Sequence, residues 1–289
     1  MRRAKLVDRG VTVVLYVVAV FFIALLAVIT AFLLYKGVKA ISPDLLSFTG
    51  NGVGIQLFNT IYLVFLSLVI TVPVGICAGI YLAEYAGKGA FIAVMRTCIE
   101  TLSSLPSIIV GLFGFLVLIQ LTHSRWNLLA GAVSLAIINI PLIARTTEDA
   151  LRSIDRSYYD GSIALGATRW QTMMRVLMRV SIPRIITGII LAAGRGFGAA
   201  AVLIYTSGMN SDINFSNWNP ASITSPLNIF RPADTLAVHI WALKTEGIMV
   251  NATQAADLSA AVLVILVFAF SLSARWLGRR LEKRMQSEK

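Results

Sequence analysis

The stretch that decides the fold class is residues 55–83, IQLFNTIYLVFLSLVITVPVGICAGIYLA, which contains no charged side chain. A transmembrane helix needs about 20 consecutive, mostly apolar residues, so this stretch can cross a bilayer with a tilt or with a kink at Pro73. In the whole chain of 289 residues, 57% are hydrophobic and 13% are charged, whereas soluble domains carry about 25% charged residues. The sequence therefore predicts a multi-span membrane protein.

Six apolar stretches along the chain meet the same requirement, and together they predict an all-α protein with six transmembrane helices. They are residues 11–34, 55–83, 103–121, 128–144, 185–205 and 258–274. The first follows Met1-Arg2-Arg3 but is about twice as long as the core of a secretion signal and has no nearby cleavage site. We therefore predict that it stays as the first helix.

The basic residues predict the orientation of these helices. The net charge of +11 would suggest nucleic-acid binding in a soluble protein, but in a membrane protein it reports which loops are cytoplasmic. With both termini inside, most cations fall on the cytoplasmic side, and the external side receives only Lys36, Lys39, Arg125, Arg231 and Lys244. We therefore predict cytoplasmic N- and C-termini.

Two regions follow from this topology. Residues 1–54 are predicted to form the first helix and an external loop with turn signals at Asp44 and Asn51, and residues 55–289 the main transmembrane domain. That domain has two loops too long to be simple connectors, the cytoplasmic loop 145–184 and the external loop 206–257. We expect both loops to contact partners.

Arg195 is the most informative single residue, because it lies near the middle of the predicted span 185–205. A central arginine costs roughly 2.5 to 3.5 kcal/mol on insertion scales, and such a charge usually marks a substrate pathway. Gly194, Gly196 and Gly198 surround it and permit close packing of helices. The alternative is a purely structural arginine that pairs with carbonyl groups or with an acid on another helix.

A second candidate binding group is Arg145, followed by Thr146 and Thr147 at the end of the predicted span 128–144. A guanidinium beside hydroxyl groups suits bidentate binding of a tetrahedral oxyanion. The alternative is a cation that only anchors the cytoplasmic end of the helix.

Several chemistries are not supported by the sequence. It contains no GxxxxGK[ST] loop for nucleotide hydrolysis. His123 and His239 are isolated, so the sequence predicts neither a catalytic residue nor a metal site. Cys77 and Cys98 lack CxxC or metal-ligand spacing and are interpreted as small packing residues.

Three motifs resemble those of the permeases of type I ABC importers: EDALR at 148–152, ALGATRWQT at 164–172 and PRIITGIIL at 183–191. More narrowly, IETLSSLPSIIVGLFG at 99–114 and PLIARTTE at 141–148 are similar to PstA-type permease subunits of bacterial phosphate importers. The resemblance extends from about residue 56 to residue 277.

The resemblance implies a set of partners and a place in the cell. A coupling segment docks on a separate ATPase subunit, and it consists of Asp160, Gly161, Ser162, Ile163, Ala164, Leu165, Gly166 and Ala167. The resemblance also implies two PstB-type ATPase subunits that bind ATP and Mg²⁺, a homologous PstC-type permease as heterodimer partner, and an external PstS-type phosphate-binding protein. This chain would bind no cofactor, lie in the bacterial cytoplasmic (inner) membrane, and use Arg145 and Arg195 as the basic residues of the passage.

The chain departs from the pattern of these permeases at three places. Asp160-Gly161-Ser162 replaces the usual Glu-Ala-Ala, and the glycine weakens a helix by about 1 kcal/mol relative to alanine. Arg179 stands where a proline is usual. Ala199 stands where an acid usually follows the intramembrane arginine, which leaves the surroundings of Arg195 more positive.

The sequence thus predicts a non-enzymatic permease subunit that translocates inorganic phosphate by alternating access in an ATP-driven importer. Permeases for sulfate, molybdate or tungstate have the same build and remain alternatives. An ion-coupled secondary transporter is a further alternative, although such transporters usually need intramembrane acids and internal repeats, and the sequence shows neither clearly. Whether the permease pair is a heterodimer or a homodimer is left open.

Overall fold

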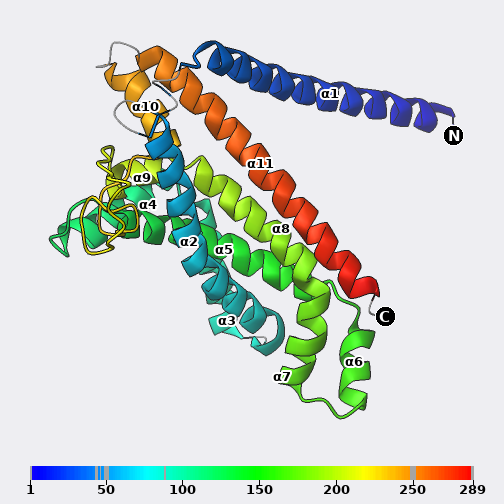
Figure 1. Ribbon diagram of the computed structural model, residues 1–289. Coiled ribbons are helices and arrows are strands. Elements are labelled where there is room, and N and C mark those ends of the chain that lie inside the picture. Colours follow the sequence, from blue (N-terminus) through cyan, green and yellow to red (C-terminus); the bar gives the residue numbers. More distant parts are fainter. Residues whose placement is uncertain are drawn as a thin grey trace.

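The computed structural model describes residues 2–42, 45, 47–48, 52–87, 89–247 and 252–287, and within these ranges the chain is helical, with no strand. The turn predicted at Asp44 and Asn51 lies outside the described residues. In chain order (Figure 1), the elements are α1 (Arg2–Lys39), α2 (Gly54–Ile80), η1 (Tyr81–Tyr85), α3 (Ala90–Ser104), α4 (Ser107–Gly114), η2 (Phe115–Gln120), α5 (Leu128–Arg152), α6 (Arg156–Ala164), α7 (Arg169–Thr172), η3 (Met173–Leu177), α8 (Met178–Phe197), α9 (Ala201–Thr206), α10 (Leu236–Glu246) and α11 (Ala252–Ser287).

Within the described ranges, five helical segments are long and apolar enough to cross a membrane, and a bent pair counted as one span makes a sixth. The five run over Arg9–Lys39, Gly54–Tyr85, Leu128–Arg152, Arg169–Phe197 and Ala252–Arg280. The predicted all-α, multi-span fold is therefore confirmed. Which side of the membrane the termini face stays a prediction.

The centre of the bundle is the pairing of α2 with α5, onto which α8 and α9 pack. Its buried core includes Leu63, Val64, Leu135 and Leu203. Two glycines bring α2 close to α5: a Cβ at Gly75 would lie 2.8 Å from Ile143 Cβ, and one at Gly79 would lie 2.6 Å from the carbonyl oxygen of Ala144. The interface therefore tolerates no side chain at these two positions.

The third predicted span is not one straight helix. The stretch 103–121 begins inside the last turns of α3, and the chain then bends by 99° between α3 and the α4–η2 segment. The break falls at Leu105–Pro106, where both residues are extended, with ψ of 133° and 134°. Proline has no backbone N–H and disfavours helical geometry in the residue before it, which explains the break.

Two other predicted spans have different limits in the structure. The stretch 128–144 is part of a longer helix, because α5 continues to Arg152. The stretch 185–205 is interrupted: α8 ends at Phe197, and Gly198 to Ala200 separate it from the short α9. Sequence reasoning missed this break because the apolar pattern runs through it.

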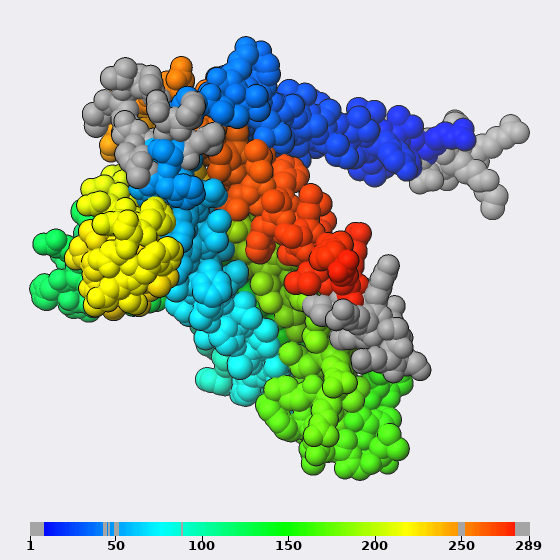
Figure 2. All heavy atoms as spheres, in the orientation of Figure 1, coloured from blue at the N-terminus to red at the C-terminus, as the bar shows by residue number. Residues whose placement is uncertain are grey.

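Helix α1 leaves the rest of the chain for most of its length (Figures 1 and 2), and its most apolar window is 0% buried. It contacts α11, where Gly37 approaches Ala261 and Lys36 lies 3.9 Å from the carboxylate of Asp257. The remaining apolar surface of α1 must be covered by lipid or by another subunit.

The close approach of α2 and α5 makes a testable prediction. In Gly79→Ala, the new methyl group meets the Ala144 carbonyl oxygen and the Thr147 side chain, so we expect overpacking to lower the free energy of unfolding by about 1–3 kcal/mol. Thermal unfolding in detergent measures the loss. Gly10→Ala is the matched control, because a Cβ there has no neighbour within 4 Å. Equal stability of both variants would contradict the close α2–α5 contact.

Candidate functional site

Arg195 lies in the last turn of α8, and its side chain is exposed. Among the described residues, no acidic side chain forms an ion pair with it. The last carbonyl groups of a helix lack intrahelical partners and carry a partial negative charge, which favours a cation at this position. The arrangement leaves the guanidinium available to an anion.

The second candidate group consists of Arg145, Thr146 and Thr147, and the structure places these three side chains in different surroundings. The Arg145 side chain is exposed on α5. Thr146 donates its hydroxyl proton to the Leu142 carbonyl oxygen at 2.9 Å and packs against Gly188 of α8. Thr147 is fully buried against Gly79 of α2. Of these three predicted binding residues, Arg145 is exposed, Thr146 is half-buried and Thr147 is buried.

Arg145 and Arg195 lie at different levels of the same helix pair. Helices α5 and α8 pack together, with Thr146 against Gly188 and the Asn139 side-chain amide donating to the Ala192 carbonyl oxygen at 3.3 Å. Arg195 is about two helical turns beyond Gly188, or about 10 Å along the axis of α8. The two arginines therefore lie at different levels along the α5–α8 pair.

The predicted coupling segment contains a helix that protrudes from the bundle. Helix α6 begins at Arg156, earlier than the predicted Asp160, and has no buried residue. The Asp155 carboxylate caps it by accepting a hydrogen bond from the Ser157 N–H at 2.8 Å, and this bond lowers the pKa of Asp155. Figure 1 shows α6 and α7 together at one end of the molecule.

The end of α6 presents an apolar side chain on a defined turn. Gly166 has a φ of 82°, a left-handed conformation that glycine adopts readily. The preceding Leu165 is 91% exposed. Ser162 and Thr172 join α6 to α7 through a hydrogen bond of 2.9 Å between their hydroxyl oxygens. The segment is therefore a compact knob with an apolar tip, suited to a groove on a partner.

A charged triad near the same end was not singled out from the sequence. Glu148 of α5 lies 2.8 Å from Arg96 of α3 and 3.1 Å from Arg152. Arg152 also donates to the Leu82 carbonyl oxygen at 3.1 Å. The spacing of Glu148 and Arg152 is an ordinary helical pair, but nothing in the pattern predicts that Arg96 meets them. The triad joins α3, α5 and η1.

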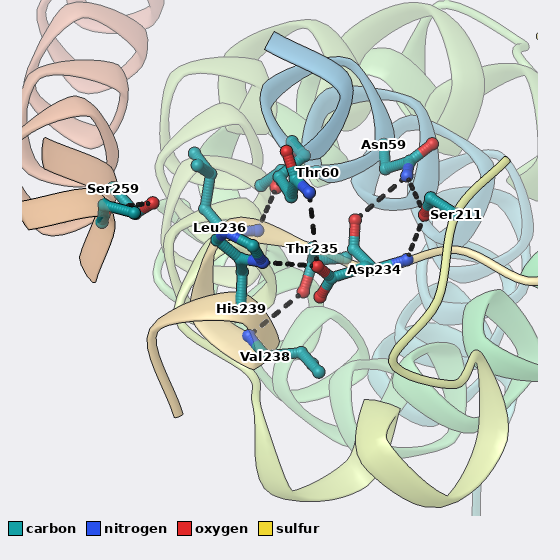
Figure 3. A network of polar contacts seen from close by, with 11 residues as sticks. Asn59, Thr60, Ser211, Asp234, Thr235, Leu236, Val238, His239 and Ser259 are labelled. Carbon is teal, nitrogen blue, oxygen red and sulfur yellow. Dashed lines mark hydrogen bonds and ion pairs between the residues drawn. The ribbon is translucent and has the colours of Figure 1, made fainter. Parts of the chain in front are cut away.

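At the opposite end, a buried polar network holds the loop between α9 and α10 against α2 (Figure 3). Asn59 donates to the Asp234 carbonyl oxygen at 2.9 Å and to the Ser211 hydroxyl at 2.8 Å. The side-chain oxygen Oδ1 of Asn59 accepts a hydrogen bond of 2.8 Å from Arg231, which is 1% exposed. Burial lowers the pKa of Arg231 to about 10. Arg231, counted from the sequence as an external cation, is thus a structural residue.

His239, predicted to be isolated, is also part of this network. Its Nδ1 atom lies 2.7 Å from the Asp234 carboxylate, which also accepts a hydrogen bond from Gln56 at 3.4 Å. Burial raises the pKa of Asp234, while His239 and Gln56 act in the opposite direction. The sequence carries no signal for the contact with Gln56, because Gln56 and Asp234 are far apart along the chain, whereas His239 follows Asp234 by only five residues.

Within the described part of the chain, no group of three His, Cys, Asp or Glu side chains could hold a metal ion. Cys77 and Cys98 are free, and both are exposed and not packed inside the chain. Both lie on faces of α2 and α3 that the rest of the chain leaves uncovered.

Comparisons with known proteins agree on the family. Residues 75–287 match the family described as "Binding-protein-dependent transport system inner membrane component". The chain is 43% identical over 288 residues to the "Probable ABC transporter permease protein YqgI" of Bacillus subtilis (strain 168), covering 97% of this chain and 98% of that protein. It is 30% identical over 252 residues to the "Phosphate transport system permease protein PstA" of Xylella fastidiosa (strain 9a5c), covering 85% and 83%. With PstA of Yersinia pestis it is 35% identical over 184 residues, covering 63% and 61%.

Solved structures show the same fold. The bacterial alginate ABC transporter in complex with its alginate-bound periplasmic protein superposes with a TM-score of 0.66 at 17% identity, over 95% of both chains. The inward-facing MetNI methionine ABC transporter superposes with a TM-score of 0.59 at 22% identity, over 83% of this chain and 99% of that chain. With its helical bundle and its family match, this chain belongs to the binding-protein-dependent transport system inner membrane components and is the permease subunit of an ABC importer, whose ATPase activity resides in separate subunits.

Proposed function

We propose that this permease translocates inorganic phosphate across the bacterial cytoplasmic membrane, with both termini in the cytoplasm. Its partners would be a homologous PstC-type permease, two PstB-type ATPase subunits that bind ATP and Mg²⁺, and a PstS-type binding protein, and this chain would bind no cofactor itself. The observation that carries the proposal is Arg195, an exposed arginine without an acidic partner among the described residues, located where a membrane helix breaks. The identity of 30–35% with PstA proteins supports phosphate as the anion.

An arginine in this position suits the recognition of a tetrahedral oxyanion. Its planar guanidinium donates two parallel hydrogen bonds to two oxygens of one anion, and the loss of surrounding water strengthens these bonds. The C-terminal end of α8 offers carbonyl groups that disfavour an anion, so Arg195 supplies the attraction that the helix end lacks. Ala199 leaves no acid beside Arg195 to neutralise it.

Transport would follow from the connection between the coupling segment and the arginines. ATP binding closes the ATPase pair and moves α6, and the Ser162–Thr172 hydrogen bond transmits the motion to α7. The continuous span Arg169–Phe197 then carries it to Arg195. In the outward-open state the anion meets Arg195 first, and after ATP hydrolysis it passes toward Arg145.

The direct test is uptake by vesicles that contain the complete importer. We expect uptake of radiolabelled phosphate to require ATP and the binding protein, with sulfate, molybdate and tungstate failing to compete at tenfold excess. Competition by one of these anions would reassign the substrate while keeping the importer. Uptake driven by a proton or sodium gradient without ATP would contradict the ATP-driven mechanism.

Removal of the intramembrane charge should separate transport from assembly. Arg195→Gln removes the bidentate donor, so we expect at least a hundredfold loss of phosphate uptake, since a charge-assisted bidentate pair contributes about 3 kcal/mol or more inside the membrane. The amount of assembled complex should not change. Arg175→Gln, at an exposed arginine of the same span, is the matched control and should keep normal uptake. Normal uptake by Arg195→Gln would reduce this residue to a packing role.

The apolar tip of the coupling segment gives a second test. Leu165→Glu places a charge in the proposed ATPase groove, so we expect phosphate-stimulated ATP hydrolysis to fall severalfold and uptake to fall with it. Leu165→Met keeps an apolar side chain of similar volume and should keep both activities. Unchanged coupling in Leu165→Glu would show that the ATPase docks elsewhere.

A further inference from the structure

Helices α8 and α11 lie side by side (Figure 1) and enclose a trench made of two connected hollows. The first hollow has a volume of about 320 Å³ and lies between the N-terminal half of α8 and the end of α11. The second has a volume of about 510 Å³ and lies further along the same two helices, where Thr30 of α1 closes it. Arg275 lines both hollows, so they meet at this residue.

The first hollow is basic. Arg275 and Arg279 line it from α11, one helical turn apart, and both side chains are exposed. No described acidic side chain forms an ion pair with either arginine. On the α8 side, the hollow is lined by Thr187 and by aliphatic residues such as Ile190. Two guanidinium groups above an apolar floor form a site for a phosphate group that remains attached to something apolar.

The second hollow is mainly apolar. On α11 it is lined by Val264, Val267, Phe268 and Leu272, with Ser271 and Arg275 as its polar residues there. On α8 it is bordered by two glycines, Gly194 and Gly198, at which a Cβ would meet no atom within 4 Å. The absence of side chains at these glycines leaves room along α8. A free hydrated anion gains nothing from such a surface, whereas a hydrocarbon chain does.

The basic hollow lies at the depth of a phospholipid's headgroup, and the apolar hollow at the depth of its acyl chains. The apolar part of α11 ends immediately before Arg275, which puts the two arginines at the level of the lipid headgroups. Trp276 follows, and Arg280 stacks on its ring at 3.6 Å from the ring centroid. Tryptophan is enriched at this boundary of the bilayer. Phe268 and Leu272 are exposed, so the trench is open on the outer surface of this chain.

We propose that this trench binds one anionic phospholipid, with its phosphate on Arg275 and Arg279 and one acyl chain in the hollow beside Gly194 and Gly198. Basic pockets between transmembrane helices at the membrane surface bind anionic headgroups by the same chemistry. The lipid would cover the face that α8 and α11 share and hold these helices together next to Arg195. The proposal requires only that the chain spans a membrane, and it does not depend on the transported anion.

The test is native mass spectrometry of the full-length protein in mild detergent, titrated with phosphatidylglycerol or phosphatidylcholine of identical acyl chains. We expect phosphatidylglycerol to bind about tenfold more tightly than phosphatidylcholine, and the double variant Arg275→Gln/Arg279→Gln to lose this preference. The matched control is Arg280→Gln, which removes the neighbouring cation that stacks on Trp276, and it should keep the preference. Equal binding of both lipids by the wild-type protein, or the same loss in Arg280→Gln, would overturn the proposal.

Two further arms of the experiment test the acyl-chain site and separate a bound lipid from a bound free anion. Gly194→Leu fills the apolar hollow and leaves both arginines in place, so it should weaken phosphatidylglycerol binding severalfold; unchanged binding would contradict the acyl-chain site. Inorganic phosphate at millimolar concentration should not displace the bound lipid. Displacement would assign the two arginines to a free anion and overturn the lipid proposal. Thermal unfolding in lipid-free detergent checks that each variant is folded.

Discussion

The close contact between α2 and α5 is the interaction on which the rest of the structure depends. Gly75 and Gly79 let the two backbones approach until Ile143 and Ala144 fill the space of the missing side chains. Lipid tails are as apolar as leucine, so helices in a membrane associate through such fitted contacts and through polar groups. Because α5 is held in this way, its other face can position α8 through Thr146 and Asn139, and its far end can carry the coupling segment. The two candidate arginines and the docking knob thus share one rigid support.

Two membrane helices are broken, and the breaks belong to one region of the bundle. The segment that follows the bend at Pro106 packs against α9, which follows the gap after α8, with Gly111 in contact with Val202. Free backbone N–H and C=O groups at membrane depth are costly unless protein or a water-filled passage surrounds them. Here the two segments that follow the breaks, α4 and α9, pack against each other inside the bundle. The break after α8 also changes the surroundings expected for Arg195. This residue lies at a helix end and not in the middle of a continuous span.

Polar contacts hold the two ends of the bundle in different ways. At one end, the partly exposed triad of Glu148, Arg96 and Arg152 joins α3 to α5. At the other end, Arg231 and Asp234 are almost completely buried; Arg231 donates to Asn59 of α2, and the Asp234 carboxylate contacts His239 and Gln56. Removing the partner of a buried charged group is costly, whereas a partly exposed ion pair exchanges partners readily. The coupling segment therefore lies at the end with the more easily rearranged contacts.

The sequence by itself determined that the chain is a helical membrane protein and, through its motifs, which family of permeases it resembles. Both conclusions depend on local properties, namely the length of apolar runs and the residues of short motifs. Only the tertiary structure decided that Thr147 faces α2, that Gln56 meets Asp234, and that the predicted span 185–205 breaks before α9. Those outcomes depend on which helices meet and on which faces, and contacts between distant residues leave no periodic trace in a single sequence.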